Sequence, residues 1–340
     1  MNKHTVALML LVGGAASAQQ PTAIVRGTVV GEGTGGLAYA IVSVEPGGRE
    51  RFTDSTGAFD FGRVVTGSAR LRARRIGFHP LDTLITVTPH MPPLSVRMEP
   101  LRIVLATIRV TGRRCRSGGA PDPATSPEVA AIFEQLRENA RRYRLVATRY
   151  PFVYRTVRTF EEPGLYAATR QKSDTLTMSS ASEWSYAPGS VVTNVVIGGR
   201  SERQMNIPAL AQLADSAFVA NHCFDYAGVS KAFGRPLVRV DFRPTMDLDV
   251  PDIEGSVYLD AEHDYIVRRL VVSLTQAARV AQDLDALDVT TVYRDTRPPI
   301  VVLDTVVAVR RGKATNGRQV RRVERQTFVD FSFRRGVTPP

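Results

Sequence analysis

The residues best suited to covalent chemistry are the cysteines, and the chain of 340 residues has two of them, Cys115 and Cys223. Cys223 directly follows His222, and a Cys–His pair is the basis of many nucleophilic sites. Neighbouring residues of a strand point to opposite faces, however, so adjacency alone does not create such a pair. No second His lies at the spacing that a zinc site would need. The alternative to a nucleophile is a Cys115–Cys223 disulfide, which requires an oxidising compartment.

The N-terminus indicates export. Asn2-Lys3-His4 is a short positive start, Val6–Val12 is an apolar run, and Ala16-Ser17-Ala18 fits a cleavage site. The apolar run is too short to span a membrane as a helix. We therefore predict that residues 1–18 are a signal peptide and that the mature chain begins at Gln19.

Export decides between the two readings of the cysteines, because an exported chain meets conditions that permit disulfides. We therefore predict a bond between Cys115 and Cys223. The expected location is the periplasm or the outer membrane, with peripheral association at the latter left open. No later stretch is long and apolar enough for a transmembrane helix.

Two clusters of acidic residues have the oxygen ligands that a hard cation prefers. The first cluster lacks the glycine and the distant Glu of an EF-hand loop. Solvated turns explain both clusters, so we predict no metal site. The clusters are Asp247, Asp249, Asp252 and Glu254, and then Asp260, Glu262, His263 and Asp264.

Known catalytic and cofactor motifs are not found. Gly31-x-Gly33-x-x-Gly36 has the letters of a dinucleotide fingerprint, but a β-like run follows it in place of the required helix. The segment is better explained as a hairpin loop. The sequence has neither a Gly-x-Ser-x-Gly elbow nor a His-Glu-x-x-His motif. We predict no catalytic residue and no cofactor.

The formal charge of +11 is carried almost entirely by arginine, since Lys occurs only at positions 3, 172, 231 and 313. The arginines are scattered, which indicates a preference for Arg over Lys more than a dedicated anion site. One local group mixes aromatic rings with arginines, a combination that can stack on nucleic acid. Export argues against that partner, so we predict packing at a domain junction. The group is Tyr143, Tyr150, Phe152 and Tyr154 with Arg141, Arg142 and Arg144.

The first part of the chain reads as short strands separated by turns, which is typical of a β-sandwich. Its centre is the turn Thr53–Phe61, where Asp54 is a turn former and Gly57 can adopt positive φ. Further on, Ala69–Arg75 alternates apolar residues with arginines, as a half-buried strand does. Asp54 and Gly57 are therefore predicted structural turn residues.

A resemblance to a known module follows from these motifs. Gly27-Thr28-Val29, Ala40–Val44, Thr53–Phe59, Gly67 and Ile76-Gly77-Phe78 resemble the carboxypeptidase regulatory-like domain. The resemblance implies a transthyretin-type Greek-key sandwich over residues 22–112 that is a structural or interaction module and not a peptidase.

The segment after this module, Leu105–Gly112, resembles the junction that follows it in TonB-dependent outer-membrane receptors. The remaining chain cannot hold a plug and a large transport barrel, so the receptor itself is rejected.

A Gly-, Pro-, Ser- and Arg-rich linker is expected at residues 113–126, followed by a second unit at 127–335. Ser126 is expected to cap a helix that starts at Pro127 and has one apolar face. The later strands indicate a curved antiparallel sheet. Gly255–Asp260 and Tyr265–Leu270 resemble envelope proteins built on a half-barrel with a covering helix, such as lipoprotein carriers.

The expected fold is therefore mostly β, with a Greek-key sandwich followed by a half-barrel-like sheet and a packed helix. The expected function is a non-enzymatic accessory or binding protein of the cell envelope, with an envelope protein or an apolar ligand as its partner. Two alternatives stay open. One is a carrier that holds lipid on the concave sheet, and the other is a hydrolase whose site forms only in three dimensions.

Cleavage after Ala18 is a direct test of export. N-terminal sequencing of the protein from the envelope fraction should begin at Gln19. Recovery of the chain from the cytoplasm with Met1 in place would contradict the prediction.

Overall fold

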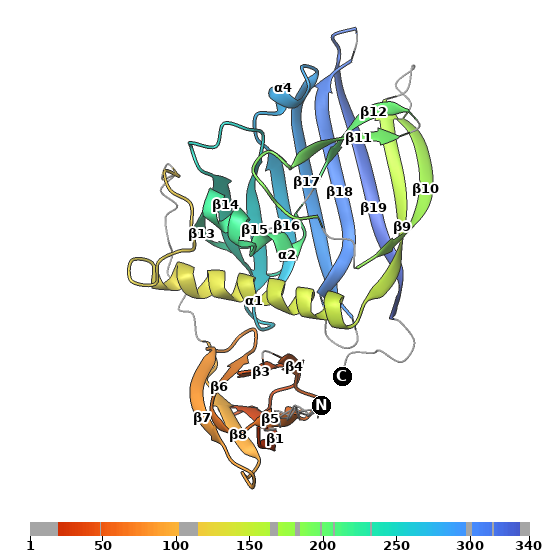
Figure 1. Ribbon diagram of the computed structural model, residues 1–340. Helices are drawn as coiled ribbons and strands as arrows, with labels where there is room; N and C mark the ends of the chain where they lie inside the picture. The colour runs from red at the N-terminus through yellow and green to blue at the C-terminus, as the bar shows by residue number, and fades with distance from the viewer. Residues whose placement is uncertain are drawn as a thin grey trace, which may run out of the picture.

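The computed structural model describes residues 20–47, 49–101, 115–163, 169–180, 184–197, 199–206, 208–231, 233–296, 301–314 and 316–333. The predicted signal peptide and the receptor-like segment Leu105–Gly112 lie outside these residues, so the cleavage site and the division at residue 112 stay predictions. The fold is mostly β, as expected, with a sandwich followed by one large curved sheet (Figure 1).

Two four-stranded sheets pack face to face in the sandwich. One has the order β4-β3-β6-β7, and in the other β1 pairs with β2, β5 and, in parallel, β8. Their inner faces alternate apolar residues, such as Val25 and Phe59 from one sheet and Val42 and Leu71 from the other, and form one core. The strands are β1 (Thr22–Gly31), β2 (Gly35–Gly36), β3 (Ile41–Glu45), β4 (Arg49–Phe52), β5 (Ala58–Val65), β6 (Gly67–Arg74), β7 (Leu81–Val87) and β8 (Leu94–Met98).

The turn between β4 and β5 carries the chain from one sheet to the other. The Asp54 carboxylate accepts hydrogen bonds from the backbone N–H groups of Thr56 and Ala58 and from the Thr56 hydroxyl. These bonds, the Thr56 hydroxyl first, lower the pKa of Asp54. Gly57 adopts φ +84°, and a Cβ built there would lie 2.5 Å from the Val29 carbonyl oxygen. Both positive φ and close approach therefore require glycine at this turn.

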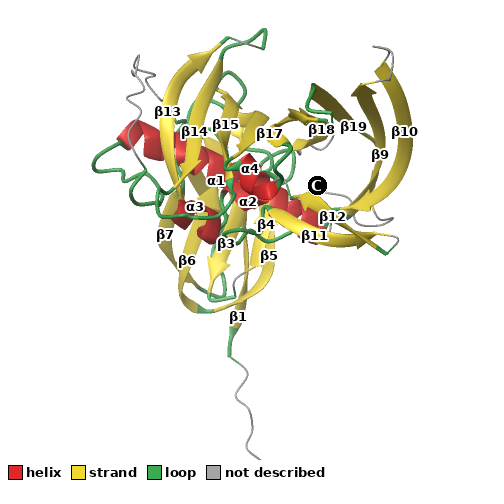
Figure 2. Cartoon of the chain, turned by 90° about the horizontal axis from the view of Figure 1, so that it is seen from above, coloured by secondary structure: helices red, strands yellow, loops and turns green. Residues whose placement is uncertain are grey.

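The second unit is a nine-stranded sheet in which every neighbouring pair is antiparallel. It curls from β13 round to β10 without closing, and the helices lie inside the curve (Figure 2). The β11–β12 hairpin is a separate small sheet. The strands are β9 (Phe152–Pro163), β10 (Thr169–Ser179), β11 (Val192–Ile197), β12 (Arg200–Met205), β13 (His222–Ser230), β14 (Leu237–Pro244), β15 (Ile253–Asp260), β16 (Ile266–Leu274), β17 (Leu284–Asp295), β18 (Val301–Lys313) and β19 (Gln319–Phe333).

The helix α1 (Pro127–Arg149) runs across one end of this sheet and separates it from the sandwich (Figure 1). Its apolar residues Ile132 and Leu136 are fully buried in the sheet's core. Ser126 stands at the N-cap position, as predicted, but its side chain makes no capping hydrogen bond. Three short helices complete the fold, α2 (Leu210–Leu213), α3 (Ser216–Asn221) and α4 (Ala277–Val280).

The loop Ile76-Gly77-Phe78 joins the two units. Ile76 is buried in the core of the large sheet, whereas Phe78 is buried in the core of the sandwich. Between them, the Gly77 N–H donates to Gln135 Oε1 on α1 at 2.7 Å.

Within the described part of the chain, no helix combines the length and apolar composition that a membrane crossing needs.

Gly57→Val should lower the free energy of unfolding by about 3–5 kcal/mol, because strain at positive φ adds to a backbone clash. Gly62→Val is the matched control, since Gly62 also has positive φ but no atom lies within 4 Å of a Cβ built there. The control should lose only the strain, about 1–3 kcal/mol. Calorimetric unfolding of the mature chain measures both. Equal losses would show that close approach does not matter at Gly57.

Candidate functional site: the open face of the curved sheet

The concave side of the large sheet has a filled half and an open half. Over β13 to β16 the core is closed by side chains from three helices, including Phe133 of α1, Leu213 of α2 and Phe218 of α3. No described helix crosses the upper part of β18, β19 and β9 (Figure 1). Val192 of β11 and Met205 of β12 pack against the main core from the hairpin. In this half the β11–β12 hairpin, and not a described helix, lies over the sheet (Figure 1).

Strand register identifies the side chains of this half. Residues two apart on a strand share a face, and Val306 and Phe328 both belong to the main core. The cross-strand rows on the same face are Ala308–Glu324–Phe160, Val306–Gln326–Arg158 and Phe328–Thr156. We call these eight residues the open face.

The end of the open face nearest α1 is apolar and aromatic. The ring of Tyr154 lies 5.5 Å from that of Phe328 and stacks 5.4 Å from that of Phe331. Burial raises the pKa of Tyr154 and, more strongly, that of Tyr293 on β17.

Two hydroxyl groups in this apolar region have no hydrogen-bond partner among the described residues. Thr156 Oγ1 and Tyr293 Oη are buried, and the two residues are 2% and 4% exposed. An unpaired buried hydroxyl costs about 1–3 kcal/mol, so each favours a water or a ligand atom beside it.

The opposite end of the open face is polar. Gln326 Nε2 donates to Glu324 Oε1 at 2.9 Å, and the Arg158 guanidinium lies 5.5 Å from the centre of the Phe160 ring. All four side chains are partly exposed. The open face therefore runs from an aromatic floor to a charged and amide-bearing rim, which suits a molecule with one apolar and one polar end.

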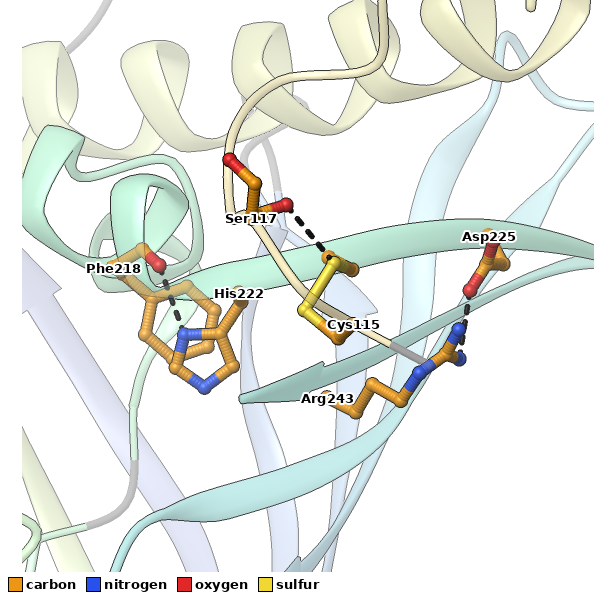
Figure 3. Close-up of a disulfide and its surroundings, with 7 residues drawn as sticks. Cys115, Ser117, Phe218, His222, Asp225 and Arg243 are labelled. Atoms are coloured by element: carbon orange, nitrogen blue, oxygen red, sulfur yellow. Dashed lines mark hydrogen bonds and ion pairs between the residues drawn. A yellow bond between two sulfur atoms is a disulfide. The ribbon is translucent and has the colours of Figure 1, made fainter. Parts of the chain in front are cut away.

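The predicted cysteine pair lies away from this face. Cys115 and Cys223 are bonded, with an S–S distance of 2.14 Å and Cα atoms 5.7 Å apart (Figure 3). Cys223 Sγ is 3.3 Å from Ser117 O, and because a disulfide sulfur carries no hydrogen, this is a van der Waals contact and not a hydrogen bond. The segment is also held by Gly119 N–H, which donates to His222 O at 3.0 Å. The described part of the expected linker is thus pinned along β13.

His222 points to the other side of β13, into the core, as alternation along a strand requires (Figure 3). Its ring stacks on Phe218 at 3.9 Å, and its nitrogens lie 2.9 Å from Phe218 O and 3.1 Å from Ile253 O. Nε2 is also 3.5 Å from Asp252 Oδ1. His222 and Cys223 therefore do not form a nucleophile–base pair.

The prediction that both acidic clusters are solvated turns is wrong for two members. Asp252 and Asp260 are fully buried. Asp252 accepts a hydrogen bond from the Tyr186 hydroxyl at 2.6 Å, and Asp260 Oδ2 lies 2.9 Å from Arg235 and 3.1 Å from His263. Sequence showed only a run of acids, whereas their partners come from distant segments.

For Asp260, burial opposes the charged form, but hydrogen bonds from His263 and Arg235 outweigh it and lower the pKa. Of the second cluster, Asp264 pairs with Arg75 of the sandwich at 3.1 Å. Among the described residues, no three His, Cys, Asp or Glu side chains converge as a metal site.

The aromatic and arginine-rich group lies at the junction of the units. Tyr150 contacts Phe52 of β4 with ring centres 6.5 Å apart, and Arg142 lies over the rings of Tyr39 and Phe52. Phe152 joins a small core with Val146 and Val302. The sequence predicted a concave sheet face but not the side chains of the open face, because the pairing of β9 with β19 joins segments far apart in the chain.

Comparisons with known proteins add little to this geometry. No protein-family model matches the chain, and no curated protein matches it. Among solved structures, a DUF1329 family protein from Desulfovibrio piger is similar, with 9% identity and a TM-score of 0.35 over 60% of this chain and 94% of the other. A TM-score this low assigns neither a fold nor a function.

The disulfide closes a loop with a sequence separation of 108 residues. The double substitution Cys115→Ser/Cys223→Ser should lower the free energy of unfolding by about 4 kcal/mol on the chain-entropy model. Denaturant unfolding of the mature protein measures the loss. A reducing agent should destabilise the wild type by a similar amount and leave the double variant unchanged. Two free thiols, found by alkylating the native unreduced protein, would contradict the bond.

Proposed function

We propose that the protein is an exported, non-enzymatic binding protein of the cell envelope, and that its open face holds an amphipathic ligand. The observation that carries the proposal is the gradient along the open face. Phe328 and Tyr154 supply an aromatic floor, and Glu324, Gln326 and Arg158 supply a polar rim. A ligand with an acyl or other apolar part would bury that part on the floor and keep its polar group at the rim.

The unpartnered hydroxyls support the same assignment. Thr156 Oγ1 and Tyr293 Oη lie in the apolar part without a partner in the described chain. A ligand atom that accepts a hydrogen bond there would remove the desolvation penalty of these two hydroxyls. This gives the site a means of orienting its ligand as well as holding it.

Two observations support binding without turnover. Both cysteines are bonded to each other, so neither supplies a thiolate nucleophile. His222 is fully buried against Phe218. Location in the periplasm or at the outer membrane rests on residues 1–18 and belongs to the proposal.

Ala308→Phe tests the site by filling it. Ala308 is the small residue in the row Ala308–Glu324–Phe160, so a phenyl ring there would cover the part of the open face beside Glu324. Val307→Phe is the matched control, because residue 307 is on the same strand and faces the convex side. Binding of a fluorescent fatty acid should weaken by about tenfold or more in Ala308→Phe and change little in Val307→Phe.

The protein purified from its own envelope provides a second measurement. Mass spectrometry of an organic extract should detect a co-purifying amphiphile in the wild type and lose it in Ala308→Phe. A protein that binds no amphiphile, or turnover of an ester, peptide or glycoside that His263→Ala abolishes, would overturn the proposal.

A further inference from the structure

A cleft of about 470 Å³ lies between the sandwich and α1, on the side of the helix away from the open face. Five arginines line it against two glutamates, and they come from two walls. The sandwich wall is formed by the outer faces of β3, β4 and β6. The helix wall is formed by the second half of α1.

The helix wall follows from helical spacing. Arg141, Arg144, Leu145, Thr148 and Arg149 stand at i, i+3, i+4, i+7 and i+8, which places them on one face of α1. The Thr148 hydroxyl donates back to the Arg144 carbonyl at 2.8 Å, so it does not compete for the arginines. This face presents three guanidinium groups around one leucine.

The two walls differ in how far their charge is neutralised. On the sandwich wall, Arg72 lies 3.2 Å from Glu45 and Arg74 pairs with Glu50. On the helix wall, Arg144 and Arg149 are exposed and have no acidic partner in the described chain; Arg144 donates only to the Ala211 carbonyl at 3.3 Å. Arg141 pairs with Glu134 at 2.7 Å, so the excess positive charge of the cleft rests on Arg144 and Arg149.

Behind the cleft, Arg74 and Arg141 share a buried glutamate of α1. Glu138 Oε2 lies 3.5 Å from Arg74 Nε and 3.4 Å from Arg141, and Glu138 Oε1 has no hydrogen-bond partner among the described residues. Glu138 is 5% exposed, and burial raises its pKa. Nearby, burial and the like charge of Arg75 lower the pKa of Arg142 to about 10.

We propose that this cleft binds a small molecule that carries two or more phosphate or carboxylate groups. Guanidinium groups donate paired hydrogen bonds that match the oxygens of both anions. Arg144 and Arg149 would hold one anionic group over Leu145, and Arg72, which is partly exposed on the sandwich wall, would donate to the other. The volume lies within the range of small-molecule clefts. The anion would also hold α1 and the sandwich together, so its binding would stabilise both.

Pyrophosphate, citrate and orthophosphate are the probes for this site. Titration calorimetry on the mature wild-type protein at low salt should show pyrophosphate or citrate binding about tenfold more tightly than orthophosphate, because only the first two reach both walls. Binding should weaken as salt is raised, since the arginines are partly exposed. The same ligands should raise the unfolding temperature by mass action.

Arg144→Glu/Arg149→Glu should reduce this binding by about tenfold or more without loss of folding, because neither side chain has an ion pair to lose. Arg318→Glu/Arg321→Glu is the control, since it makes the same change in charge at exposed positions at and beside the β18–β19 turn. Should the glutamate pair unfold, Arg144→Gln/Arg149→Gln gives the same test. Absence of binding in the wild type, or equal loss in the control, would overturn the proposal.

Discussion

The rest of the structure depends on the burial of polar groups along α1, which is covered by the sheet on one side and by the sandwich on another. Gln135 accepts from the Gly77 N–H, and Asn139 both donates to the Tyr265 carbonyl and accepts from the Val267 N–H. Left unpaired, each of these buried groups would cost about 1–3 kcal/mol. The helix can therefore sit in only one position along its axis, and that position sets the distance between the two units.

Both proposed sites follow from this position. Toward the sheet, Val146 packs with Phe152 and Val302 and closes the apolar end of the concave side. Toward the sandwich, Arg144 and Arg149 face β3, β4 and β6 across the cleft. A rotation of α1 by one residue, about 100°, would remove the first contact and turn the arginines out of the second. The proposed amphiphile site and the proposed anion site therefore both depend on the same position of α1.

Sequence patterns predicted the elements better than their partners. Alternation in Ala69–Arg75 and the Asp54–Gly57 turn report local geometry, which a short window of sequence contains. The prediction that Asp260 lies in a solvated turn was wrong because its charge is neutralised by Arg235 and Arg268, which no local pattern connects to it. The residues of the open face were not predicted for a similar reason, since their rows join β9 to β19 across more than half of the second unit. Long-range pairing decides burial, and burial decides what a side chain can do.

The arginines show how this limit affects a functional inference. Along the chain they are scattered, and a compositional preference is a sufficient explanation. Strand alternation already places Arg72 and Arg74 on the outer face of β6, and helical spacing places Arg144 and Arg149 together on α1. Neither pattern shows that the two faces meet. The loop Ile76–Phe78 brings them together by burying one end in each core. Charge that is dispersed in sequence becomes a site only because the two hydrophobic cores share that loop.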